Sequence, residues 1–170
     1  MKTLYLITGP AGVGKSTISK KIAESLPKSC LIEGDDVYHL VVGGYVSPWK
    51  EGNHLSFFWK NCISLIENCL AEGYDVVFNY ILSKNDVLKL KNNFSGSDVV
   101  IKFVALIVDE KTIVERDKLR PQDCQMGERS IVLLKEILAE NFNKSNILDS
   151  SKLSVEETYQ EILKSDRFVI

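Results

Sequence analysis

Gly9-Pro-Ala-Gly-Val-Gly-Lys-Ser-Thr17 directly follows an apolar run, residues 3–8, that has the composition of a buried strand. The spacing of these nine residues fits G-x-x-x-x-G-K-[ST], a turn whose backbone N–H groups wrap a phosphate. A helical pattern begins at Lys15 and directs its positive dipole end at the same anion. A chance glycine-rich turn is the alternative, but such a turn has no need of a strand before it and a helix after it.

This stretch predicts a site for the phosphates of ATP. Lys15 would supply a positive charge to the β- and γ-phosphates, and the Ser16 hydroxyl would be a ligand for Mg²⁺. We expect the nucleotide to contact the whole stretch: Gly9, Pro10, Ala11, Gly12, Val13, Gly14, Lys15, Ser16 and Thr17.

The rest of the chain alternates short β-rich runs with helical patterns, which is typical of an α/β protein with a parallel sheet covered by helices on both faces. Strands are expected at residues 3–8, 30–32, 75–78, 99–108 and 146–148. Helices are expected at residues 15–26, 55–70, 109–119 and 128–142, with two more opened by capping boxes at Ser83/Asp86 and Ser154/Glu157. We expect one domain over residues 1–170.

Composition excludes several classes of protein. The chain has 170 residues, 45% of them hydrophobic, and a formal net charge of −2. It is too apolar for a disordered chain and not basic enough to favour nucleic-acid binding. No apolar run has the length of a membrane span, and the run at residues 4–7 is too short for a signal peptide. We expect a cytoplasmic monomer or homodimer with reduced cysteines.

Three carboxylates follow the second expected strand in Glu33-Gly-Asp-Asp36. They would lie at the carboxyl edge of the sheet, where parallel sheets bind ligands. One interpretation is a turn with an N-cap for a helix at Val37. The other is that Asp35 orients an attacking hydroxyl or accepts its proton, while Glu33 or Asp36 holds Mg²⁺ through water.

The arginines are concentrated in one segment. Three of the four in the chain lie in residues 116–129: Arg116, Arg120 and Arg129. Arg116 and Arg120 share one helical face, and arginine suits bidentate contacts with phosphate. We expect a lid at about residues 116–129 that brings these charges to the transferring phosphoryl group. Surface ion pairs with Glu115, Asp117, Asp123 and Glu128 are the alternative.

The least regular segment, about residues 37–54, suits a loop that closes over a small-molecule acceptor. Tyr45, Trp49, Lys50 and His54 are candidate contacts in it. Trp49 covering the hydrophobic core is an equally weighted alternative. Phe58 and Trp59 lie on the apolar stripe of the next helix and are expected in the core.

Four segments together resemble the small P-loop kinases: gluconate kinase, shikimate kinase, adenylylsulfate kinase and the chloramphenicol phosphotransferase-like proteins. The segments are the glycine-rich stretch at residues 9–17, E-G-D-D at 33–36, E-R-D-K-L-R-P at 115–121 and I-L-D-S-S at 147–151. The glycine-rich stretch is highly specific, and the other three gain weight from occurring together in the expected order.

The resemblance implies a three-layer P-loop fold with strand order 2-3-1-4-5 and ATP with Mg²⁺ as the phosphoryl donor. It gives Asp35 the substrate-hydroxyl role and Glu33 the first acidic position. Arg116 and Arg120 match lid arginines, with Arg120 as the neighbour of adenine. Ser150 and Ser151 match the turn beside the base.

The chain departs from the nucleotide kinases after the third strand, where it reads Val77-Phe-Asn79-Tyr80 with no acidic residue. Asn79 would contribute a hydrogen bond to the substrate but no charge. These residues predict an ATP-dependent phosphotransferase that acts on a hydroxyl of a small molecule, with Lys15, Asp35, Arg116 and Arg120 as catalytic residues. The alternatives are an NTPase without an acceptor and a catalytically silent nucleotide-binding module.

Overall fold

Five parallel strands form one sheet in the order β2-β3-β1-β4-β5, which confirms the fold class and strand order expected from the sequence. The computed structural model describes residues 1–94, 96, 98–122 and 125–170. The strands are β1 (Lys2–Thr8), β2 (Ser29–Glu33), β3 (Asp75–Asn79), β4 (Val99–Ile107) and β5 (Ile147–Asp149). β1 lies at the centre because its residues are apolar on both sides and are buried from Leu4 onward.

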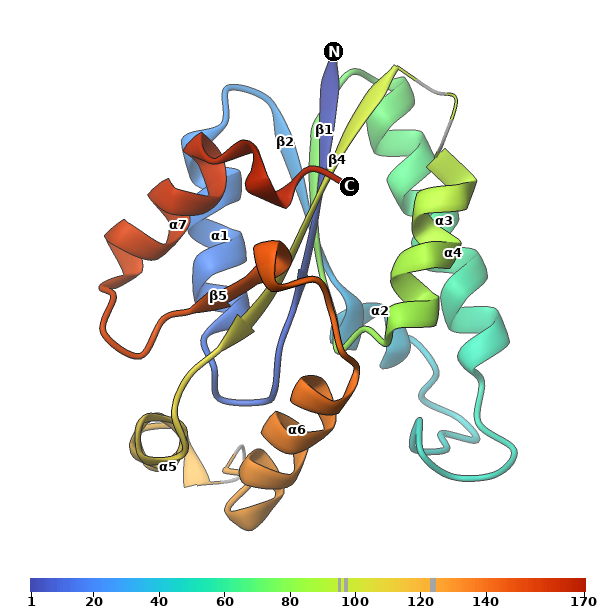
Figure 1. The fold of residues 1–170 in the computed structure, drawn as a ribbon. Helices are drawn as coiled ribbons and strands as arrows, with labels where there is room; N and C mark the ends of the chain where they lie inside the picture. The colour runs from blue at the N-terminus through green and yellow to red at the C-terminus, as the bar shows by residue number, and fades with distance from the viewer. Residues whose placement is uncertain (95, 97, 123–124) are drawn as a thin grey trace.

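Helices cover both faces of the sheet (Figure 1). On one face lie α1 (Lys15–Ser25) and α7 (Val155–Lys164), and on the other lie α3 (Leu55–Ala71) and α4 (Lys84–Phe94). Three further helices lie toward the end of the sheet where β1 and β3 terminate: α2 (Gly34–Tyr38), α5 (Glu110–Lys118) and α6 (Glu128–Ala139). Within the described ranges, no helix is both long and apolar enough to cross a bilayer.

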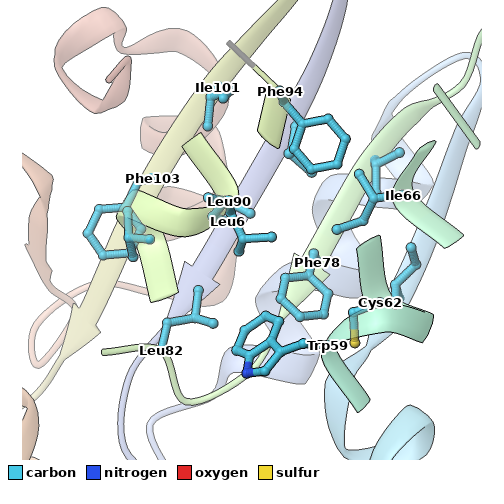
Figure 2. Close-up of a cluster of buried hydrophobic side chains, with 14 of the residues drawn as sticks. Leu6, Trp59, Cys62, Ile66, Phe78, Leu82, Leu90, Phe94, Ile101 and Phe103 are labelled. Atoms are coloured by element: carbon cyan, nitrogen blue, oxygen red, sulfur yellow. The ribbon is translucent and has the colours of Figure 1, made fainter. Parts of the chain in front are cut away.

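The core on the α3 and α4 side is rich in aromatic residues (Figure 2). Phe58 and Trp59 are buried there, as their place on the apolar stripe predicts, and Trp59 lies close to Phe78 of β3. The other face has its own core, which α1, α7 and strand residues such as Ile7 and Leu106 form. The sheet is therefore packed on both sides, so its strand ends are held rigidly.

Local hydrogen bonds start the helices where the sequence predicts them. Ser83 and Asp86 bond each other's backbone N–H, and Ser154 and Glu157 form a second capping box. Asp109 accepts a hydrogen bond from the backbone N–H of Thr112 and caps α5. The two capping boxes are confirmed, because each needs only residues three positions apart.

The boundaries of several elements differ from the sequence-based expectation. α2 begins at Gly34 with Glu33 as its N-cap, so Asp35 and Asp36 lie in its first turn instead of capping a helix at Val37. The expected helix at 128–142 ends at Ala139, and Asn141 then has a φ of 50°. β2 gains one residue at each end, and β5 lies one residue later than expected, because backbone pairing with a neighbouring strand extends past the apolar run.

Lys102 is a buried lysine on β4 whose ammonium holds the end of α7. Its Nζ donates to the carbonyls of Ile162, Leu163 and Ser165 at 2.9–3.3 Å. We expect Lys102→Met to lower the free energy of unfolding by about 1–3 kcal/mol, because these carbonyls lose their donor in a buried setting. Urea unfolding measures the change. The exposed Lys135→Met is the control, and equal effects of both substitutions would contradict this account.

Candidate functional site

The glycine-rich turn at residues 9–17 begins at a position that only glycine can occupy. Gly9 has a φ of 148°, and a Cβ there would lie 2.5 Å from the backbone oxygen of Leu106 on β4. The turn therefore lies tightly against the end of the sheet, and α1 starts six residues later at Lys15. This close approach is what a backbone cradle for phosphate needs.

The ammonium of Lys15 lies under this turn. Its Nζ donates to the carbonyls of Gly9 at 2.9 Å and Pro10 at 3.0 Å. Burial lowers the pKa of Lys15 to about 8; Asp35 and Glu33 act to raise it, and Arg120 acts to lower it. The nearby carboxylates therefore do not fully compensate the cost of burying the Lys15 charge. Such a group is expected where an anion binds.

Ser16 and Glu33 come together from two elements far apart in the sequence. The Ser16 hydroxyl donates to Glu33 Oε2 over 3.0 Å. A serine hydroxyl beside a carboxylate is a suitable oxygen set for Mg²⁺, which binds few protein oxygens and keeps phosphate and water ligands. Among the described residues, no three His, Cys, Asp or Glu side chains gather as a metal site. The Ser16 hydroxyl and the Glu33 carboxylate would fit a magnesium ion that takes its other ligands from phosphate and water.

A cavity of about 550 Å³ opens over the turn. Its lining contains the expected residues Lys15, Ser16, Asp35, Arg116 and Arg120. The remaining lining is mostly apolar and was missed in part: Ile81, Leu119, Ser150, Leu153, Val155 and Thr158. The capping box at Ser154 could have pointed to two of these residues, because Leu153 and Val155 flank Ser154 between β5 and α7.

The two arginines that line the cavity lie in different surroundings. Arg116 donates from Nη1 to the Val13 carbonyl at 2.8 Å and from Nη2 to the Ser150 carbonyl at 3.1 Å. Arg120 pairs with Asp117 at 3.3 Å and is among the charges that act on Lys15. Thus Arg116, which ties the glycine-rich turn to Ser150, lies at the turn that the resemblance places beside the base. The placement of Arg120 beside adenine stays a prediction.

Asp117 links the end of α5 to the start of α6 from a buried position. Its carboxylate accepts hydrogen bonds from the backbone N–H groups of Met126 and Gly127 and from Arg120. Burial acts to raise its pKa, but these hydrogen bonds outweigh burial, so the pKa lies below the ordinary value. The sequence offered Asp117 only as a surface ion-pair partner. Asp123 and Cys124, which the expected lid also contains, lie outside the described residues.

Asp35 lies in the first turn of α2 and lines the cavity. A Cβ on Gly34 would lie 2.6–2.8 Å from the ring and Cβ of Tyr80, so the backbone next to Asp35 rests directly on that ring. Burial and the nearby Asp35 raise the pKa of Tyr80, which therefore stays a neutral phenol. Asp36 is exposed as Asp35 is, but it does not line the cavity.

Three expected substrate contacts do not line this cavity. Trp49 is 74% exposed, so it does not cover the core either. Tyr45 lies on the outer part of the loop at residues 39–54 and is 41% exposed. Asn79 is 3% exposed between Glu33 and Ile7, its neighbours in the sheet, and its Nδ2 has no hydrogen-bond partner. A contact between Asn79 and a substrate stays a prediction.

The pKa of Lys15 makes nucleotide binding depend on pH. Below about pH 8 the free protein carries a protonated Lys15, and above it the lysine loses its charge. A triphosphate favours the charged form, so binding above about pH 8 takes up a proton. We expect ATP affinity to be flat at lower pH and to fall by up to about tenfold per pH unit above it.

Calorimetric titration in two buffers of different ionisation enthalpy measures this proton uptake. Lys15→Met serves as the control, because it lacks the titrating group and its weaker binding should not change over the same range. Equal pH profiles for the two proteins would contradict the assignment.

Several solved structures share this fold. The tunicamycin resistance protein of Deinococcus radiodurans aligns with a TM-score of 0.68 at 17% identity, over 95% of this chain and 94% of that one. A gluconokinase from Sinorhizobium meliloti 1021 aligns at 0.62 and 23% identity, over 95% and 89%. Thymidylate kinase from Candida albicans aligns at 0.65 and 16% identity, over 96% and 90%. No curated protein matches the chain.

In sequence, residues 4–138 match the family described as AAA domain. The match covers most of the chain, including the glycine-rich turn, Asp35, Arg116 and Arg120. The chain therefore belongs to the AAA domain family, and it shares the fold of the kinases named above.

Proposed function

We propose that the protein transfers the γ-phosphoryl group of ATP to a hydroxyl of a small-molecule acceptor. The observation that carries this proposal is the placement of Asp35. This carboxylate lines the same cavity as Lys15, Ser16 and Arg120. A carboxylate beside a triphosphate site is repelled by the phosphates, and it is useful there when it engages a hydroxyl that attacks phosphorus.

The nucleotide would lie along the cavity with its phosphates in the glycine-rich turn. The apolar side chains of Leu153 and Val155, after β5, offer a surface for the base. Ser16 and Glu33 would hold Mg²⁺, which when bound neutralises charge on the phosphates. The turn, α1 and the cavity walls thereby orient the γ-phosphoryl group toward Asp35.

Transfer requires few protein groups. The acceptor oxygen forms a bond to the γ-phosphorus, its proton passes to the Asp35 carboxylate, and the bond between this phosphorus and the β,γ-bridging oxygen breaks to release ADP. Lys15 and Arg120 stabilise the negative charge on the moving phosphoryl group and on the leaving oxygen. Asp117 keeps Arg120 in place until the phosphates compete for it.

The different surroundings of the two arginines predict different kinetic effects. Arg116 holds the turn by the Val13 carbonyl and borders Ser150, so we expect Arg116→Ala to raise the KM for ATP about tenfold. Arg120 acts near the phosphates, so Arg120→Ala should lower kcat by about 100-fold or more. Steady-state kinetics over a range of ATP concentrations separates the two effects. The division of roles is wrong if both variants change only KM.

Acceptor-stimulated release of ADP tests the proposed function. A phosphotransferase hydrolyses ATP slowly with water alone and consumes it faster once a suitable hydroxyl compound is present. An NTPase turns over at its full rate without any acceptor and keeps that rate in Asp35→Asn. A silent binding module gains thermal stability from ATP and releases no ADP with any acceptor. The screen therefore separates the proposal from both alternatives.

A further inference from the structure

Asp35 is connected through its backbone to a group of stacked rings in α2 and the loop that follows it. His39 follows Asp35 by four residues, and its Nδ1 bonds to the Asp35 carbonyl over 2.7 Å. A carbonyl only accepts, so Nδ1 carries the hydrogen and the Nε2 atom of the neutral ring is an acceptor. The Tyr45 hydroxyl lies 3.4 Å from that Nε2 and donates to it. Tyr45 is thus linked to the backbone of Asp35 through one imidazole.

Four rings form what we call the aromatic wall: Tyr38, His39, Tyr45 and His54. His39 and Tyr45 are stacked with centroids 5.4 Å apart and planes 10° apart, and Tyr38 and His54 are stacked at 4.1 Å and 24°. Tyr38 also meets Tyr45 edge to face at 5.9 Å. Because Tyr38 is buried and Tyr45 is 41% exposed, the wall is anchored in the core and presents ring surface to solvent.

The charge around the aromatic wall opposes an anion. Residues 33–54 contain four acidic residues and one basic residue, Lys50, for a net charge of −3. The first arginine of the chain is Arg116, so the elements on the acceptor side contain none of the guanidinium groups that usually bind carboxylate or phosphate. Ile81, which lines the cavity near Asp35, adds apolar surface. These surroundings favour ring faces and disfavour acidic groups.

We infer that the acceptor is an uncharged hydroxyl compound with a flat ring, which stacks on the aromatic wall at Tyr45 while its hydroxyl reaches Asp35. This inference rests on the proposed function. Stacking of rings adds to the energy of burying them, whereas a carboxylate or phosphate beside the aromatic wall would meet the net negative charge of residues 33–54, which contain no arginine. The inference excludes hydroxy acids and nucleoside monophosphates as preferred acceptors.

A matched acceptor panel tests the inference with the full chain, ATP and Mg²⁺. Ribonucleosides and phenyl β-glucoside are uncharged and have a flat ring. Nucleoside 3′-monophosphates keep the ring and the 5′-hydroxyl but add an anion, gluconate is a hydroxy acid, and glucitol is uncharged without a ring. We expect at least one uncharged ring compound to raise ADP release about tenfold or more over the rate with water, and the other three groups to have little effect.

The outcomes separate failure of the inference from failure of the proposed function. Stimulation by gluconate or by the monophosphates, without stimulation by the uncharged ring compounds, overturns the acceptor class and leaves the phosphotransferase in place. Equal stimulation by glucitol also overturns it, because no ring would then be needed. ATP binding without stimulation by any member of the panel overturns both the acceptor class and the proposed function.

Variants of Tyr45 test the place of stacking. We expect Tyr45→Ala to raise the KM for the acceptor about tenfold while the KM for ATP is unchanged, because ring stacking is lost on the acceptor side only. Tyr45→Phe retains the ring and should keep most of the affinity. Val42→Ala, in the same loop and 87% exposed, is the control. An unchanged acceptor KM in Tyr45→Ala, or an equal rise in the control, overturns the role of the wall.

Discussion

Lys15→Met is expected to lower the rate of phosphoryl transfer by about 100- to 1000-fold. The lysine is the positive charge inside the glycine-rich turn, where its Nζ lies on the carbonyls of Gly9 and Pro10. Methionine fills a similar volume without charge, so the transition state loses a stabilising group in a site where charges are weakly screened. Burial already disfavours the charged lysine, as its lowered pKa indicates, so the fold should not lose stability.

Rapid-quench measurement of ADP formation at saturating ATP detects this loss. Thermal unfolding without nucleotide checks that the fold is intact. Lys20→Met, an exposed lysine on the same helix, is the matched control and should retain full activity. Near-normal transfer by Lys15→Met would mean that the turn does not hold the reacting phosphates.

Asp35→Asn is expected to lower acceptor-stimulated transfer by about 100- to 10,000-fold, because the amide cannot accept the hydroxyl proton. ATP affinity at about pH 7 should change little, since Asp35 faces the acceptor side of the cavity. Asp35 also acts to raise the pKa of Lys15. The substitution therefore lowers that pKa further, and ATP binding by the variant should begin to weaken at a lower pH than in the wild type.

Asp36→Asn is the matched control for this prediction. Asp36 is the adjacent carboxylate in the first turn of α2 and is exposed as Asp35 is, but it does not line the cavity. Single-turnover kinetics with a stimulating acceptor compares the two variants. If Asp36→Asn loses transfer and Asp35→Asn retains it, the acceptor hydroxyl is engaged by the other carboxylate.

Much of the fold could be predicted because its signals are local or repeat along the chain. The buried strands read as apolar runs, and the caps at Ser83, Asp109 and Ser154 each involve a partner three residues away. Element ends were less predictable. β2 extends to Glu33 because it pairs with Asn79 of β3, and this pairing depends on a neighbour more than 40 residues away in the chain.

In the candidate site too, the residues with local sequence signals were predictable and those with distant partners were not. The glycine-rich turn and Asp35 were found from their spacing and from their position after a strand. The buried role of Asp117 and the hydrogen bond from Arg116 to Val13 were not found, because their partners come from other parts of the chain. Tyr45 was chosen as an aromatic residue in an irregular loop, and only its stacking on His39 relates it to Asp35.

By itself, the sequence determined that a tight glycine-rich turn joins a central strand to a helix, since nine consecutive residues contain the whole pattern. Tertiary structure alone decided which distant groups surround that turn. Ser16 donates a hydrogen bond to Glu33, and Arg116 donates one to the Ser150 carbonyl. The charges of Asp35 and Arg120 act on Lys15. All three interactions require the sheet to align its strand ends. Hydrophobic packing on both faces of the sheet sets that alignment, and no local pattern along the chain encodes it.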